Sequence, residues 1–191
     1  MENWRINAQI LEFDEENHSY FYNGEPVESV TQLLAKKFPS KYSKIPKEVL
    51  EIASERGTRI HKEIECYCKG FDLGTNEVKD FKFLKKHYKF NVKENEIPIY
   101  FEFGGKVIAG RVDMILEMNG EFAVADIKTT STLDKEYLGH QLNLYRLGVE
   151  SCYGYKISSL YGIHIKDGKR KMVKIPIVEK EALLESLKEA L

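Results

Sequence analysis

AGRVDMILEMNGEFAVADIKTT, residues 109–130, carries the clearest structural signal in this chain. Its Asn119-Gly120 pair is among the strongest two-residue hairpin signals, because both positions of a type I′ turn need positive φ. Counting back from this turn along both strands brings Asp113 opposite Asp126. The sequence therefore predicts two acidic side chains next to each other on neighbouring strands.

The same register brings Arg111 opposite Lys128. Side chains alternate along a strand, so both basic residues are expected on the same face as the two aspartates. The other face is apolar and is expected to be core. Its facing pairs are Val112 with Ile127, Met114 with Ala125, and Leu116 with Ala123.

Two carboxylates placed in this way repel each other. Directly opposed Cβ atoms lie ~4.5–5.5 Å apart, and like charges there are destabilising. At ~4 Å the repulsion is ~4 kcal/mol for an effective dielectric constant of about 20. A divalent cation such as Mg²⁺ or Mn²⁺ reverses the sign of the interaction, because these ions prefer carboxylate oxygens. A β-bulge that separates the acids, or an ion-pair quartet with Arg111 and Lys128, would also explain the pair.

The composition is that of a globular protein: 191 residues, 42% hydrophobic and 31% charged. The net charge of −1 means that affinity for nucleic acid has to come from a local basic patch. Three cysteines without a CxxC pair exclude a four-cysteine zinc or iron–sulfur site within one chain and are expected to be reduced thiols. The N-terminus lacks an apolar signal core, and no apolar run is long enough to span a membrane. We expect a cytoplasmic protein of a bacterium or a phage-infected host cell, without membrane contact.

Periodicity elsewhere predicts helices on both sides of a central group of strands, an α/β arrangement. A hairpin is expected over 9–27, and Ser29 precedes a short helix that ends before Pro39. A further helix is expected between Pro46 and Gly70, with the apolar residues Val49, Ile52, Ile60 and Ile64 at helical spacing. Others are expected at 75–90, with Phe81, Leu84 and Tyr88 inward, at about 134–149 and at 179–191. Strands are expected at about 98–103, 106–118 and 121–128, with a last hairpin over 158–178.

Four short motifs follow one another along the chain. The first places a glycine one helical turn before a histidine, and glycine inside a helix costs ~1 kcal/mol relative to alanine, so it usually marks a close approach of another group. A lone histidine on a helix is more often structural than functional. The motifs are GxxxH at Gly57–His61, GxxD at Gly110–Asp113, DxK at Asp126–Lys128 and QxxxY at Gln141–Tyr145.

This ordered series resembles the RecB-like branch of the PD-(D/E)XK nuclease superfamily, which includes RecB-type nuclease domains, CRISPR-associated exonucleases and the mitochondrial single-strand DNA exonuclease. SVTQLL, residues 29–34, is similar to the mitochondrial enzyme and to phage-borne relatives. The resemblance covers about residues 29–148. It implies a restriction-endonuclease-like α/β core, a central mixed β-sheet flanked by helices. We expect one nuclease domain over 1–191: an N-terminal hairpin and helices in 1–95, a catalytic core at about 46–166 and a C-terminal helix at about 179–191.

The resemblance also implies roles for individual residues. His61, Asp113, Asp126 and the carbonyl of Ile127 would bind the catalytic Mg²⁺ or Mn²⁺, which would polarise the phosphate and make a bound water more acidic. Lys128 would act as a general base or stabilise charge, although a lysine beside two acids is also consistent with a plain salt bridge. A second metal held by Asp113 stays open.

Gln141 and Tyr145 lie one turn apart on one helix face, and the resemblance implies that they contact the DNA backbone or brace the site. A tyrosine half in the core with a glutamine at its edge is the other interpretation. Residues 129–131, Thr-Thr-Ser, are expected to bond phosphate or to cap the next helix. Glu65 either holds the imidazole or is an ordinary solvated glutamate; Glu96 lies roughly where some relatives carry an acid and is left outside the core set.

Two departures from the family pattern stand out. Val112 precedes the first acid where the superfamily name has proline, which is usual in this branch. The iron–sulfur cysteines of many CRISPR-associated and helicase-linked members are absent, so no iron–sulfur cluster is expected.

Surfaces for DNA are predicted from basic and aromatic residues. Arg111 and Thr129 near the acids are expected to contact DNA, and the stretch 35–47 offers Phe38 and Tyr42 for stacking on unpaired bases. A basic stripe at helical spacing can track phosphates, although such stripes are usually solvated faces. It consists of Lys82, Lys85, Lys86 and Lys89.

The expected function is a metal-dependent deoxyribonuclease that hydrolyses phosphodiester bonds. The resemblance favours an exonuclease on single-stranded DNA or DNA ends, and the stand-alone size suggests a phage or mobile-element origin. A protein partner from a recombination or replication system stays open. The alternatives are a nucleic-acid-binding or adaptor module that has lost catalysis, and a protein unrelated to nucleic acid whose acids belong to a salt-bridge network.

Overall fold

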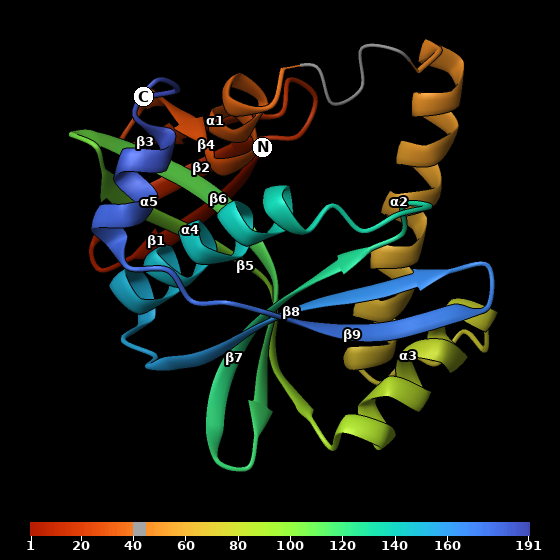
Figure 1. Ribbon diagram of the computed structural model, residues 1–191. Helices are drawn as coiled ribbons and strands as arrows, with labels where there is room; N and C mark the ends of the chain where they lie inside the picture. Colours follow the sequence, from red (N-terminus) through yellow and green to blue (C-terminus); the bar gives the residue numbers. More distant parts are fainter. Residues whose placement is uncertain (40–44) are drawn as a thin grey trace.

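Nine strands form one mixed sheet over the described residues, 1–39 and 45–191, of the computed structural model, and five helices cover both of its faces (Figure 1). The order is β1-β2-β3-β4-β6-β7-β8-β9, with β5 paired to β6 beside this path. The predicted α/β class is confirmed. The elements are β1 Glu2–Ile6, β2 Gln9–Asp14, β3 Ser19–Tyr22, β4 Glu25–Ser29, α1 Val30–Lys37, α2 Lys47–Cys68, α3 Asn76–Tyr88, β5 Asn91–Phe103, β6 Lys106–Met118, β7 Glu121–Lys128, α4 Lys135–Tyr153, β8 Ile157–Lys166, β9 Lys169–Ile175 and α5 Lys180–Leu187.

Strand β6 organises the sheet, because other strands pair with both of its edges. Strand β5 runs antiparallel along the whole of one edge. The other edge is shared: β4 pairs with Ile108 and Ala109, whereas β7 pairs with Met114–Met118. Residues 110–113 lie between these two pairings, at the point where β4 and β7 diverge. We call this opening the fork of β6.

The central hairpin has the predicted register. Asn119 and Gly120 have φ values of 53° and 79°, as a type I′ turn requires. The ladder ends at Met114 and Ala125, one position before the two aspartates, so the direct opposition of Asp113 and Asp126 was wrong. Beyond this point β7 pairs in parallel with β8 and leaves β6.

Two apolar cores lie on either side of the sheet. One packs α1, α4 and α5 against it, and the other packs α2 and α3. All six residues predicted for the apolar face of the hairpin are buried. Val112 nevertheless belongs to the first core and the other five to the second. Ile108 and Ala109, which precede the fork along β6, both belong to the first core. Because consecutive residues of a strand project from opposite faces, the first core covers both faces of β6 at this point.

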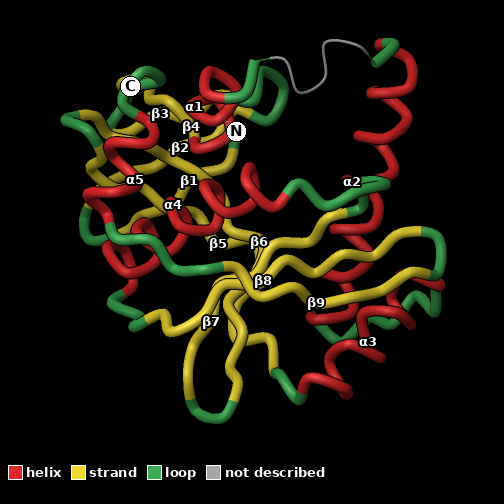
Figure 2. Tube along the Cα trace, viewed as in Figure 1, coloured by secondary structure: helices red, strands yellow, loops and turns green. Residues whose placement is uncertain are grey.

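Helix α2 packs against the sheet with only half of its length. Of the four apolar residues at helical spacing, Ile60 and Ile64 are fully buried, whereas Val49 and Ile52 are 52% and 67% exposed. The first half of α2, which carries Val49 and Ile52, stands clear of the strands (Figure 2). Tyr88, at the end of α3, is likewise exposed.

The N-terminal region forms an antiparallel meander of four strands, β1 to β4. The predicted hairpin corresponds to β2 and β3, and β1 and β4 extend it on either side. Ser29 ends β4 and caps α1 as expected. Its Oγ accepts from the Gln32 backbone N–H at 3.1 Å, while the Gln32 side chain accepts from the Ser29 N–H at 2.8 Å. No helix in the described part of the chain combines the length and apolar character needed to cross a membrane.

Candidate active site

Four elements bring polar side chains together at the fork of β6. Glu96 comes from β5, Asp113 from β6, Asp126 and Lys128 from β7, and His61 from the middle of α2. Two cavities meet there and share His61 and Asp113, one of about 760 Å³ towards α4 and one of about 280 Å³ towards the N-terminal meander. The fold thus concentrates three acids, a histidine and a lysine at the floor of an accessible cleft.

The motif glycines allow the elements to approach closely. A Cβ at Gly57 would lie 3.3 Å from Thr129 Oγ1, so α2 packs tightly against the end of β7. A Cβ at Gly110 would lie 3.2 Å from the ring of Tyr145, on α4. Both distances are shorter than ordinary contacts, which explains why these positions carry glycine.

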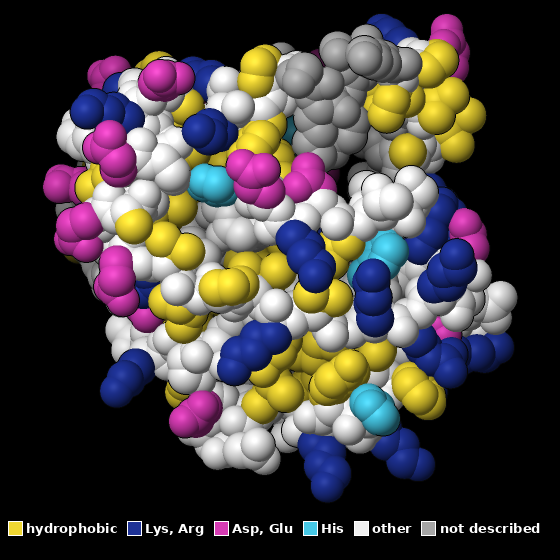
Figure 3. Space-filling view, in the orientation of Figure 1, with side chains coloured by type: hydrophobic (Ala, Val, Ile, Leu, Met, Phe, Trp, Pro, Cys, Tyr) yellow, Lys and Arg dark blue, Asp and Glu magenta, His cyan; other side chains and the backbone are white. Residues whose placement is uncertain are grey.

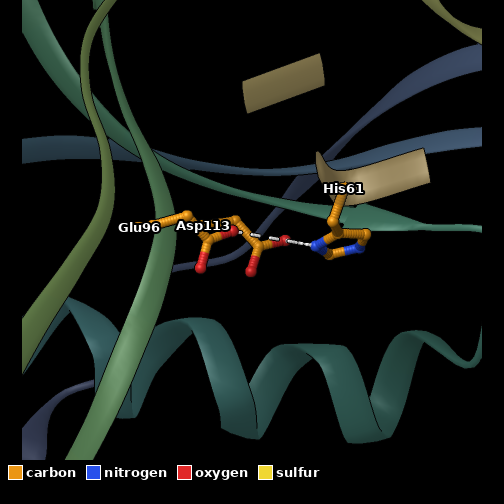
Figure 4. A group of neighbouring side chains, drawn as sticks. All are labelled: His61, Glu96 and Asp113. Atoms are coloured by element: carbon orange, nitrogen blue, oxygen red, sulfur yellow. Dashed lines mark ion pairs between the residues drawn. The ribbon is translucent and has the colours of Figure 1, made fainter. Parts of the chain in front are cut away.

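Asp113 and His61 form the centre of the cluster (Figure 4). Asp113 Oδ2 accepts from the Ile127 backbone N–H at 2.7 Å, so the side chain takes the place of the missing ladder bond. His61 Nδ1 lies 3.5 Å from the same oxygen and 4.0 Å from Glu96 Oε1. Ligand atoms of these three side chains all lie within 4.8 Å of one another, close enough for one metal ion.

The other nitrogen of His61 defines its tautomer. Nε2 lies 3.0 Å from the carbonyl oxygen of Ile127. A carbonyl only accepts, so Nε2 carries the proton and Nδ1 faces the carboxylates of Asp113 and Glu96. When the ring is neutral, Nδ1 therefore offers its lone pair where a cation among these acids would lie. A carbonyl that holds the opposite ring nitrogen is the usual way to orient a histidine ligand.

Asp126 is joined to α4 through a short polar chain. Lys128 Nζ lies 2.7 Å from Asp126 Oδ2 and donates to Gln141 Oε1 at 2.9 Å. The Gln141 amide in turn donates to the Tyr145 hydroxyl at 3.2 Å. Gln141 and Tyr145 are each only 5% exposed. They brace Lys128 from inside the domain, the second of the two roles that the resemblance implied.

The acids affect one another's protonation. Burial, reinforced by the charge of Asp113, raises the pKa of Glu96 to about 7 and that of Asp126 to about 6. Burial alone would lower the pKa of His61, but Asp113, Asp126 and Glu96 together raise it. The pKa of Lys128 is also raised, because Asp126 and Asp113 outweigh the effect of its burial. The cluster therefore has excess negative charge that protons partly neutralise.

These residues fit a hard divalent cation. Carboxylate and carbonyl oxygens suit Mg²⁺ and Mn²⁺, and an imidazole nitrogen is compatible with Mn²⁺. Asp126 Oδ2 is buried, and the Lys128 ammonium lies 2.7 Å from it. One ammonium does not offset three neighbouring carboxylates, since the pKa values of Asp126 and Glu96 are both raised. A cation would reduce the repulsion among the acids.

Several predicted neighbours lie elsewhere. Arg111 does not face Lys128, because the pairing of β6 with β7 ends at Met114. Arg111 instead forms ion pairs with Glu96 at 3.1 Å and with Glu2 at 3.3 Å. The ion-pair quartet of Asp113 and Asp126 with Arg111 and Lys128 is therefore wrong for Arg111, whereas Lys128 does pair with Asp126. Glu65 pairs with Lys62 and Lys69 rather than His61, the ordinary interpretation.

The loop after β7 lines the larger cavity with residues 129–134. Asp134 caps α4 through its bond to the Tyr137 N–H, so the capping alternative for residues 129–131 was wrong. Thr129 lies against Gly57 at the cavity wall, where contact with DNA stays a prediction.

Two surfaces outside the cleft were predicted to bind DNA, the lysine stripe of α3 and the stretch 35–47. The basic stripe of α3 lines a different surface cavity with Tyr67 and Phe83. None of its four lysines lines either cavity of the fork. Phe38 packs against the rings of Tyr137 and His140, so it is not free to stack on bases as expected. Tyr42 lies outside the described residues.

Glu96 is the site residue that sequence reasoning left out. It follows a β-bulge in β5 and has a φ of 49°, a conformation that points its side chain towards Asp113. Its signal in the sequence was the Gly104-Gly105 pair between β5 and β6, a two-residue turn whose glycines have φ values of 59° and 76°. Ile97 pairs with Val112 in the register of this turn, and the next position brings Glu96 opposite Asp113. This second hairpin was not among the predictions.

We expect Glu96→Gln to stabilise the metal-free protein at pH 8. A carboxyl group with a raised pKa binds its proton more tightly in the folded state, so its contribution to stability falls as pH rises from about 4 to about 7. Removing this charge should increase the free energy of unfolding by about 1–2 kcal/mol, and Tm by roughly 2–6 °C, in EDTA. Thermal unfolding at pH 5 and pH 8 measures the effect.

Glu94→Gln is the matched control, an exposed glutamate on the same strand. The difference between the Glu96 variant and wild type should shrink at pH 5, where Glu96 is protonated. A lower Tm of Glu96→Gln at pH 8 would mean that its ion pair with Arg111 outweighs the repulsion from Asp113.

Comparison with known proteins identifies the superfamily of this chain. The family model of the PD-(D/E)XK nuclease superfamily matches residues 81–191, which include Glu96, Asp113, Asp126 and Lys128. No curated protein sequence matches the chain. Among solved structures, SSO0001 is 20% identical, with a TM-score of 0.48 over 85% of this chain and 73% of that one. A candidate exonuclease from Eubacterium rectale is 15% identical, with a TM-score of 0.48 over 86% of this chain and 77% of the other. With more than half of its length matched by the family model, this chain belongs to the PD-(D/E)XK nuclease superfamily.

Proposed function

We propose that this protein is a Mg²⁺- or Mn²⁺-dependent deoxyribonuclease, and that it acts as an exonuclease on single-stranded DNA or DNA ends. The observation that carries the proposal is the convergence of His61, Glu96, Asp113 and Asp126 beside Lys128 in an open cleft. Chains built only for stability avoid buried like charges. A nuclease needs them to hold a cation against a phosphate.

Two ligand sets are compatible with this site. One is His61, Asp113, Asp126 and the Ile127 carbonyl, as the resemblance implies; the other is His61, Glu96 and Asp113, whose ligand atoms lie within 4.8 Å of one another. When bound, such an ion polarises the phosphodiester and makes a bound water more acidic. The residues of the chain supply the rest. Asp113 is pre-oriented by the Ile127 N–H, and the carbonyl of the same residue orients His61. Both ligands are thus fixed by one peptide segment at the end of β7.

Lys128 provides positive charge at the scissile phosphate in this proposal. Its raised pKa keeps the ammonium protonated in the metal-free protein, and a cation held by Asp126 and Asp113 would lower that pKa. Charge stabilisation and general-base catalysis are therefore both compatible with this position. Gln141 and Tyr145 keep the ammonium beside Asp126 and directed into the cleft.

Digestion of end-labelled DNA tests the proposal. With Mn²⁺ or Mg²⁺, linear single-stranded DNA should be degraded, and EDTA should stop the reaction. Closed circular single-stranded DNA of the same sequence should resist if the enzyme needs an end. Cleavage of the circle would make the protein an endonuclease. Failure to cut any substrate with either metal would favour the alternative of a binding module without catalysis.

A further inference from the structure

We propose that the face of the β8–β9 hairpin that carries Lys166, Lys169 and Lys171 binds the phosphates of the nucleic-acid strand held in the active site. This inference rests on the proposed function and extends its substrate-binding surface beyond the cleft. None of the three lysines belongs to the basic surfaces that the sequence predicted. We call this surface the hairpin track.

Strand register connects the track to the active site. Lys128 on β7 pairs with His164 on β8, and His164 pairs with Lys171 on β9. Residues paired across a sheet project from the same face, and adjacent strands lie ~4.8 Å apart. Lys171 therefore lies on the face of Lys128, with its backbone about 10 Å away.

Lys166 connects the hairpin track to the cleft. It lines the larger cavity together with Asp126 and Lys128, and it pairs across the hairpin with Lys169. His164, between the two rows, is 5% exposed and bonds the Thr130 carbonyl at 2.6 Å, which holds the cavity-lining loop against β8. The basic residues form a continuous path from the site to the edge of the sheet.

The lysines of the track are available for a ligand. Lys169 and Lys171 are exposed, and no acidic side chain in the described part of the chain pairs with either. Lys166 Nζ lies 3.6 Å from Asp167 Oδ2, but Asp167 is shared with Arg56 at 2.8 Å. In contrast, Arg170 on the other face is engaged with Asp80 and with the ring of Phe83.

The distribution of charged side chains on the face drawn in Figure 3 favours this surface. Figure 3 shows Lys and Arg gathered over the β8–β9 hairpin and α3, whereas Asp and Glu lie mainly on the opposite side, over α1 and α5. A net charge of −1 therefore conceals a basic side next to the cleft. Affinity for a polynucleotide comes chiefly from such local contacts with phosphate.

Lysines on an edge strand have a second common role. Strand β9 is at the edge of the sheet, and charged residues there prevent pairing with other chains. Lys174 distinguishes the two explanations. It lies on the same edge strand but pairs with Tyr161, whose side chain packs in the second core, so it projects from the opposite face. If these lysines only protect the edge of the sheet, Lys174 and Lys171 should matter equally. If the track binds a nucleic-acid strand, only Lys171 should matter for binding.

The test compares Lys169→Glu/Lys171→Glu with the control Lys174→Glu. Binding of fluorescein-labelled oligodeoxythymidine is followed by anisotropy in EDTA over a range of salt concentrations. The double variant should bind at least tenfold more weakly than wild type, with the salt slope reduced by about 1.4 for two lost contacts. Turnover of bis(p-nitrophenyl) phosphate with Mn²⁺, which reaches only the cleft, should stay unchanged.

Equal affinities of the double variant and the control would overturn the track. Equal Tm values of the three proteins exclude unfolding as the cause of a difference. Because binding is measured without metal, it is independent of catalysis. Wild-type protein that cleaves neither DNA nor the small diester refutes the proposed function, and the anisotropy result still decides whether the hairpin binds a strand.

Discussion

Asp113→Asn should lose both metal binding and DNA cleavage. Asp113 is the only residue that contacts both His61 and the Ile127 N–H among the described carboxylates, so it is central to either possible ligand set. In the wild type, Mn²⁺ at a hundred times its Kd should stabilise the fold by ~2.7 kcal/mol, a rise in Tm of roughly 5–10 °C. The variant should show almost none of this gain, and turnover should fall at least ~1,000-fold.

Glu117→Gln is the matched control, because it removes one carboxylate from the same strand at the far end of the hairpin, where Glu117 pairs with Phe122. It should keep both the stabilisation by Mn²⁺ and the activity. Thermal unfolding with and without Mn²⁺, together with cleavage rates of labelled DNA, makes the comparison. If Asp113→Asn keeps the full gain in Tm, the cation does not bind at the fork.

Lys128→Met should separate catalysis from metal binding. The ammonium is not a metal ligand, and removing it leaves all the acids in place. Turnover is expected to fall ~100- to 10,000-fold, since stabilisation of transition-state charge and proton transfer contribute effects of this size. The rise in Tm with Mn²⁺ should persist or increase, because the cation then no longer competes with Lys128 for Asp126.

Two further variants define the role of Lys128. Lys174→Met removes a lysine from β9 and should leave the activity unchanged. Lys128→Arg keeps the charge and should recover part of the lost rate if charge stabilisation dominates. Loss of the Mn²⁺ effect in Lys128→Met would instead show that Lys128 acts through the packing of β7 and α4.

The local features of this protein follow from short stretches of sequence. Asn119-Gly120 sets the turn and register of the central hairpin, because few other pairs accept two positive φ values. Ser29 and Gln32 define the start of α1 through reciprocal capping bonds. Ordered motifs also identify His61, Asp113, Asp126 and Lys128, which the fold then brings together.

Long-range contacts account for the predictions from sequence that the structure contradicts. The opposition of the two aspartates assumed that β6 and β7 stay paired, but β7 turns to a parallel partner that lies after α4 in the chain. The first half of α2 has the periodicity of a buried helix, yet Val49 and Ile52 are exposed among the residues that the structure describes. Arg111 follows the same logic for its partner Glu2, which comes from the distant strand β1, whereas Glu96 lies across the Gly104-Gly105 turn on the neighbouring strand β5.

Residue types and short-range geometry were therefore enough to define the hairpin and the cap, because these depend on backbone conformations within a few residues. Tertiary packing brought His61 to Asp113, buried Gln141 and Tyr145 behind Lys128, and aligned Lys171 with the active-site strand. Each of these depends on which strands and helices become neighbours. That choice minimises the exposed apolar surface of the whole chain, a quantity that no single stretch of sequence contains.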